Sequence, residues 1–182
     1  MSYIPSYEEA LDIVKQYNKE EFHIKHAEIV AGIMGRFSKE HDPQRVEFWQ
    51  VVGLLHDLDY ENYPDQHCIK SQEIMRELEI AEDIIHATAS HGYGITVDIE
   101  PTHKMEKILY AIDELSGLIG AVAIMRPSKS VADLELKSVK KKYKNLNFAK
   151  GCSREVIERG AKMLEIELDE LITMTIHAMR SL

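Results

Sequence analysis

The chain has 182 residues, of which 45% are hydrophobic and 29% are charged, so we expect one domain with a full apolar core and not a disordered chain. Its 31 acidic and 22 basic residues give a formal net charge of −9. This charge argues against a general nucleic-acid or membrane-surface binder, because both of those partners are polyanionic. No export signal is visible at the N-terminus, and two cysteines make no disulfide framework. We therefore expect a cytoplasmic location.

Helical periodicity dominates the chain from its N-terminus onward, and strand patterns are sparse. Ser6 is the expected N-cap of the first helix, and Pro43 is expected in the first turn of the third. That third helix ends at Leu55 and is apolar on nearly every face, so it should run through the middle of the domain. The pattern predicts helices at residues 7–18, 23–39, 43–55, 67–78, 81–90, 104–125, 133–144, 153–164 and 169–182.

The most informative pair of residues is His56-Asp57, which stands where the apolar helix ends. Both are strong metal ligands. Burial of an unpaired carboxylate in such a setting costs several kcal/mol, and a bound metal ion offsets that cost. A single His-Asp pair is also common at the exposed end of a helix, so the pair needs support from other parts of the chain.

Two distant residues give that support. His26 shares a helical face with apolar residues, which predicts that its imidazole points inward; His23, one turn earlier, is a less embedded alternative. Asp113 lies within another apolar helix, and Gly117 and Gly120 continue its face. Small residues at these positions would leave open volume beside the carboxylate, as a substrate cavity requires.

The order His26, His56-Asp57 and Asp113 resembles the signature of the HD-domain metalloproteins, and the resemblance covers roughly residues 20–125. It implies an all-α HD-domain helical bundle, to which the helical pattern at residues 153–164 and 169–182 adds a C-terminal helical pair. We accordingly predict a single HD domain over residues 1–182, with its core at about 20–125 and a helical extension at about 130–182. The extension is expected to pack on this core or on a second subunit.

Two further histidines, His67 and His91, stand where the dinuclear branch of that family has extra ligands. The arrangement is similar to that of bacterial HD hydrolases of dinucleoside tetraphosphates and of diiron oxygenases on the same scaffold. By this resemblance Asp57 would bridge two ions, with His67 and His91 on the second ion. The first ion would be held by His26, His56 and Asp113.

The ligand set is rich in nitrogen, which favours one or two ions of Fe, Mn, Co, Ni or Zn over Mg²⁺. We expect a metal-activated hydroxide to cleave a phosphate ester or a nucleotide, with Asp57, His56 and Glu61 as the catalytic residues. Asp59 and His86 are alternatives to Glu61 as the proton donor to the leaving group. The basic residues expected to contact the substrate are Arg126, Lys129 and Lys104.

The expected partner is a small phosphorylated molecule such as a nucleotide, and neither a nucleic-acid polymer nor a membrane; a homodimer is also compatible with the sequence. Two other functions remain open, because they would use the same ligands. One is a diiron oxygenase, and the other is a metal-binding HD protein without catalysis. Cys68 follows His67 directly, but neighbours on a helix point about 100° apart, which favours a buried thiol over a ligand.

Overall fold

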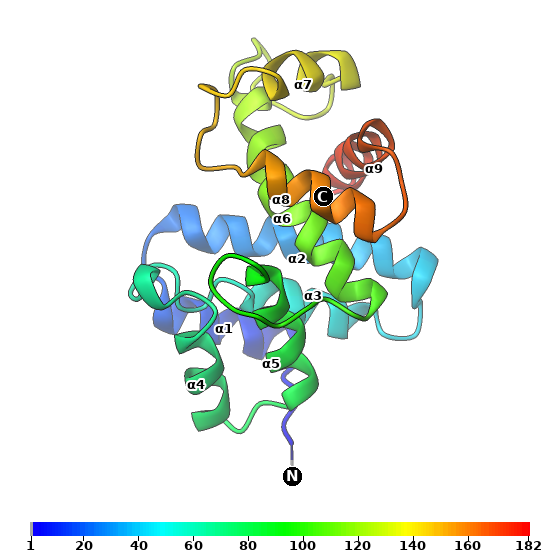
Figure 1. The fold of residues 1–182 in the computed structure, drawn as a ribbon. Coiled ribbons are helices and arrows are strands. Elements are labelled where there is room, and N and C mark those ends of the chain that lie inside the picture. The colour runs from blue at the N-terminus through cyan, green and yellow to red at the C-terminus, as the bar shows by residue number, and fades with distance from the viewer. Residues whose placement is uncertain (1) are drawn as a thin grey trace.

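The computed structural model describes residues 2–182, which confirm the predicted all-α fold: they contain helices and two isolated β-bridges but no sheet (Figure 1). No helix within this range is both long and apolar enough to cross a membrane. The helices are α1 (Tyr7–Tyr17), α2 (Glu21–His41), α3 (Val46–Leu55), α4 (Lys70–Glu77), α5 (Glu82–Ala89), α6 (Lys104–Ile124), α7 (Leu136–Tyr143), α8 (Arg154–Met163) and α9 (Leu168–Arg180), with short 3₁₀ turns η1 (Pro64–Gln66) and η2 (Ser90–Gly92).

Helix α3 folds back against α2 after a short turn, and the two helices approach each other very closely. A Cβ atom added to Gly53 would lie 2.7 Å from the Cα atom of Ala31, so only glycine fits at this crossing. The prediction that the third helix begins at Pro43 is wrong: the turn occupies that position and α3 begins at Val46. The reversal brings the C-terminal end of α3 beside the first turns of α2.

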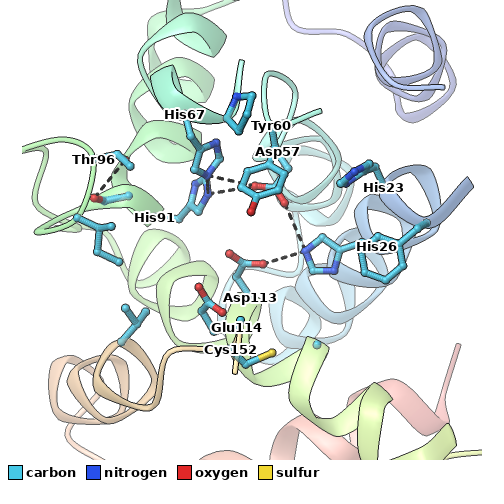
Figure 2. Close-up of a pocket in the computed structure, with 17 residues that line it drawn as sticks. His23, His26, Asp57, Tyr60, His67, His91, Thr96, Asp113, Glu114 and Cys152 are labelled. Carbon is cyan, nitrogen blue, oxygen red and sulfur yellow. Dashed lines mark hydrogen bonds and ion pairs between the residues drawn. The ribbon is translucent and has the colours of Figure 1, made fainter. Parts of the chain in front are cut away.

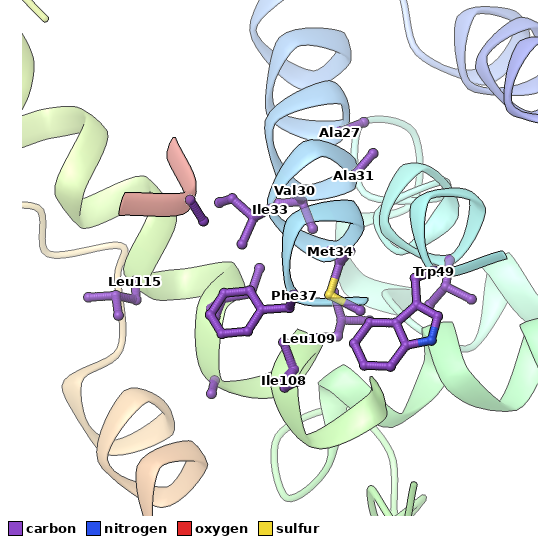
Figure 3. Packing of buried hydrophobic residues seen from close by; sticks show 14 of the residues in the cluster. Ala27, Val30, Ala31, Ile33, Met34, Phe37, Trp49, Ile108, Leu109 and Leu115 are labelled. Carbon is purple, nitrogen blue, oxygen red and sulfur yellow. The ribbon is translucent and has the colours of Figure 1, made fainter. Parts of the chain in front are cut away.

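The apolar core lies between α2, α3 and α6, as Figure 3 shows. Val30, Ile33 and Met34 of α2 are fully buried, as are Trp49 of α3 and Leu109 of α6. Burial of such a side chain stabilises the fold by roughly 1.5–3 kcal/mol. This packing fixes the relative positions of α2, α3 and α6, the helices that carry most of the polar side chains of the candidate site.

The C-terminal helical pair is present as α8 and α9. Helix α8 packs against α6 at Gly160, where an added Cβ would lie 2.5 Å from the Cα atom of Ala111. Helix α9 packs against α2 and α6, and the side chain of Leu182 just beyond it covers Gly32. Figure 1 shows α7 at one end of the molecule, beyond the C-terminal end of α6.

The segment at residues 67–69 departs from the predicted helix. Helix α4 begins only at Lys70, because η1 precedes His67 and Cys68 has a left-handed backbone with φ of 65°. An ordinary side chain rarely adopts this conformation, and it interrupts any helix. His67 and Cys68 therefore lie on an irregular loop and not on two faces of one helix.

Candidate metal centre

His56 and Asp57 lie immediately after α3, where the apolar helix ends in the interior. The His56 side chain is fully buried, and its Nδ1 atom lies 2.7 Å from the carbonyl oxygen of Gly53. A carbonyl oxygen only accepts hydrogen bonds, so Nδ1 carries the proton and Nε2 faces Asp57 and Asp113. The distances from Nε2 to Asp57 Oδ2 and to Asp113 Oδ1 are both 3.2 Å.

His26 and Asp113 reach the same point from α2 and α6. His26 Nε2 lies 2.9 Å from Asp113 Oδ1 and 3.6 Å from Asp57 Oδ2. The ring of His56 contacts that of His26 edge-on, with their centroids 5.2 Å apart. Four side chains thus present ligand atoms that all lie within 4.8 Å of one another. His23 lies beside the cavity but outside this group (Figure 2).

His67 is held by a buried acid. Asp59 is fully buried, and its Oδ1 accepts a hydrogen bond from His67 Nδ1 at 2.8 Å while its Oδ2 accepts one from the Ser71 backbone N–H at 2.8 Å. Asp59 therefore orients the imidazole so that Nε2 points into the cluster. This is the arrangement by which carboxylates commonly fix metal-ligating histidines.

His91 lies in η2, and its ring is fixed in a similar way. Its Nδ1 donates to the carbonyl oxygen of Thr88, so its Nε2 also faces inward, 3.0 Å from His67 Nε2. Three of the four cluster imidazoles (His56, His67 and His91) thus have Nδ1 committed to an oxygen acceptor and Nε2 turned to a shared centre.

The carboxylate of Asp57 faces the two pairs of histidines with different oxygens, and Figure 2 shows it between His26 and the pair His67 and His91. Its Oδ2 is near His26 and His56, whereas its Oδ1 lies 3.4 Å from His67 Nε2 and 3.3 Å from His91 Nε2. One carboxylate therefore joins two groups of ligand atoms. A bridging ligand of two metal ions needs this relationship between its oxygens.

The electrostatics of the cluster favour positive charge at its centre. Burial alone would lower the pKa of His56, but Asp57 and Asp113 raise it to about 10. Burial alone would raise the pKa of Asp113, yet His56 and His26 hold it well below its ordinary value. The carboxylates thus stabilise cationic charge beside the imidazole nitrogens. Together with the nitrogen-rich donor set and the fixed rings, this shows that the residues fit a divalent metal ion.

Cys68 also lies in this region, although the sequence analysis favoured a buried thiol over a metal ligand. Its buried Sγ lies 3.7 Å from His91 Nε2, and His67, Cys68 and His91 form a second group that could hold a metal ion. The expected buried thiol is found, but the argument from helical directions fails because the segment is not helical. Burial would raise the pKa of the thiol, and the two histidines lower it to about 6.

Glu61, predicted to be catalytic, is absent from the cavity lining and instead stabilises a helix end. Its carboxylate accepts hydrogen bonds from the backbone N–H groups of Lys19 (2.9 Å) and Glu20 (3.1 Å), directly before α2. The Lys19 N–H bond is the main cause of the lowered pKa of Glu61. Negative charge at a helix N-terminus is favourable, which explains why the acid stands here.

This assignment predicts a purely structural effect. Replacing Glu61 by alanine should lower the Tm by roughly 3 °C, the loss typical of a missing helix cap, and leave the metal content unchanged. Thermal unfolding and elemental analysis measure the two quantities, with Glu77→Ala on the exposed end of α4 as a control. Loss of metal from the Glu61 variant would contradict this purely structural role.

The three basic residues predicted to contact the substrate are absent from the lining of the main cavity. Arg126 pairs with Asp133 at 3.2 Å and lies just beyond the end of α6, about 20 Å from Asp113 in the direction of the helix axis. Lys104, at the other end of α6, is about 13 Å from Asp113 along the axis. Lys129 is exposed on the following turn. The helix that carries Asp113 is long, so residues at its ends do not reach the cluster. His86, the other proposed proton donor, pairs instead with Glu106 at 2.8 Å.

The cavity beside the cluster has a volume of about 430 Å³. As the sequence predicts, Gly117 lies at its wall, close to Asp113, whereas Gly120, also expected there, is not part of the lining. Two residues that the sequence did not single out complete this side: Glu114 and Cys152. Glu114 accepts a hydrogen bond from the Ser153 backbone N–H at 3.2 Å, and burial together with Asp113 raises its pKa to about 7.

The loop that carries Cys152 to the cavity is organised by one guanidinium group. All five N–H donors of Arg154 are bound to backbone carbonyl oxygens, at distances from 2.6 to 3.2 Å. The acceptors are Tyr143, Asn145, Phe148, Ala149 and Cys152. Lysine lacks this planar set of donors, so arginine is needed to hold the loop in this shape.

Helices α2, α3 and α6, with a cluster of histidines and aspartates at their junction, define a helical protein with a candidate dinuclear metal centre. The sequence matches the model of the family described as HD domain over residues 23–118, more than half of the chain. The chain therefore belongs to the HD-domain family, in a superfamily of metal-dependent phosphohydrolase type. No curated protein and no solved structure matches it significantly.

Proposed function

We propose that this protein is a phosphohydrolase that cleaves small phosphate esters with two divalent transition-metal ions. His26, His56 and Asp113 would hold one ion, His67 and His91 the other, and Asp57 both. The observation that carries the proposal is the position of Asp57, whose two oxygens face the two pairs of histidines at 3.2–3.6 Å and 3.3–3.4 Å.

Bound ions would supply Lewis-acid stabilisation of the phosphoryl oxygens and activation of water. The contribution of the chain is to hold the ligands rigidly. The Nδ1 atoms of three histidines are fixed by Gly53, Asp59 and Thr88, so little reorganisation is needed at their Nε2 atoms. The adjoining cavity, at about 430 Å³, is of a size that suits a small organic phosphate.

Phosphate release that depends on metal tests this function. We expect protein loaded with Mn²⁺ or Co²⁺ to release inorganic phosphate from phenyl phosphate or AMP, and chelation followed by desalting to abolish the release. Re-addition of the ion should restore it. Bound metal without turnover of any ester would favour the non-catalytic alternative, and oxygen uptake by the reduced iron form would favour the oxygenase. The cytoplasmic location and the homodimer remain predictions.

A further inference from the structure

The charged side chains around the cavity are of one kind. Apart from histidines, the acidic or basic side chains that line it are Asp57, Asp113 and Glu114, which are all carboxyl groups. Within residues 2–182, the lining includes neither lysine nor arginine. A carboxyl group, ionised or not, offers no positive charge to a phosphate. One phosphate can be neutralised at the metal centre, whereas a second or third would meet only neutral or acidic wall.

The rim of the cavity is apolar and aromatic. Phe22 is 76% exposed, Ile95 is 60% exposed and Tyr60 is 45% exposed, and all three line the cavity. Val156 of α8 contributes a further apolar group to the wall. Exposed apolar side chains that surround a polar centre are typical of a ligand-binding site, because a ligand can remove them from water.

Part of this wall comes from outside the segment that matches the HD domain. Gly151, Cys152 and Val156 follow residue 118 by more than thirty positions, and the Arg154 contacts described above hold them in place. All six proposed ligands, by contrast, lie within residues 23–118. The chain thus adds its own surface to the side of the cavity where the organic part of a substrate would lie.

We infer that the substrate is a phosphate monoester with a single phosphate group and an uncharged, largely apolar or aromatic alcohol; this inference rests on the proposed function. In the reaction, water adds to phosphorus and the bond between phosphorus and the alcohol oxygen breaks. That oxygen takes one proton from the water, so the products are the alcohol and hydrogen phosphate. Nucleoside polyphosphates and other substrates with adjacent phosphates are disfavoured.

Two matched pairs of compounds test this inference on the metal-loaded protein, without excess divalent ion. We expect kcat/KM for AMP to exceed that for ATP by at least tenfold, and kcat/KM for phenyl phosphate to exceed that for glycerol 1-phosphate by about tenfold, since a buried ring contributes roughly that much. Phenylphosphonate and methylphosphonate are not hydrolysed, and calorimetry should show that phenylphosphonate binds more tightly than methylphosphonate. Phe22→Ala should reduce this preference for the ring severalfold.

A lysine introduced at the rim tests whether the lack of cationic side chains in the cavity lining disfavours ATP. Ile95→Lys places a positive charge at the rim and should raise the ratio of ATP to AMP turnover roughly tenfold, the worth of one charge-assisted contact. Ile124→Lys makes the same change on an exposed residue of α6 outside the cavity lining and should leave the ratio unchanged. Phosphate release with ATP equal to or better than AMP would overturn this inference alone. Failure to hydrolyse or bind any of the compounds would overturn the proposed function as well.

Discussion

Replacement of Asp57 by alanine is expected to remove metal binding and phosphate release together. Among residues 2–182, Asp57 is the one acid whose oxygens lie near both pairs of histidines, so its loss weakens both groups of ligands at once. Loss of the ions removes several kcal/mol of charge stabilisation from the reaction, which corresponds to a fall in kcat/KM of at least about a thousandfold. Elemental analysis and a phosphate-release assay measure the two effects.

The same variant should lose the stabilisation that metal gives to the folded protein. At a metal concentration about a thousand times the Kd, binding stabilises the native state by about 4 kcal/mol, or roughly 10 °C in Tm for a chain of this size. We expect this rise with the native protein and with Asp65→Ala, an exposed acid on the neighbouring turn, but not with Asp57→Ala. A metal-free Asp57 variant with full activity would refute the proposed centre.

Much of the fold followed from local patterns. The apolar face around His26 and the wholly apolar run before His56 depend on helical periodicity, which acts over a few residues and is visible in a sequence. Small residues after Asp113 likewise indicated open space, and Gly117 does line the cavity. For the same reason, the three helices that carry the HD signature, α2, α3 and α6, could be placed from the sequence.

Other features depend on contacts between distant segments or on a single backbone torsion. The left-handed conformation of Cys68 turns its thiol toward His91, and no periodicity indicates it. Glu61 bonds to the backbone just before α2, more than forty positions earlier in the chain. Its closeness to His56-Asp57 in the sequence was therefore misleading. Arg126 illustrates a related error: it directly follows the helix that carries Asp113, but it is thirteen residues further along, a separation of about 20 Å at the helical rise.

Asp59 gives the sharpest test of whether the two ions are separable. It is fully buried, it accepts hydrogen bonds from His67 and from the Ser71 backbone, and no ligand atom of the first group depends on it. In Asp59→Asn the amide retains one acceptor oxygen and places an NH₂ group against the other donor. We therefore expect the affinity for the second ion to fall about 10–100-fold while the first ion stays bound.

Calorimetric metal titration and elemental analysis should then find two ions per native chain and one per Asp59→Asn chain at limiting metal. His67→Ala should give the same single-ion species, and Asp83→Asn on the exposed face of α5 should retain both ions. A protein that keeps two ions of unchanged affinity would show that Asp59 does not position His67. Equal loss of both ions would show instead that Asp57 couples the two groups of ligands so strongly that neither ion binds alone. The proposed function would then require both ions to bind together.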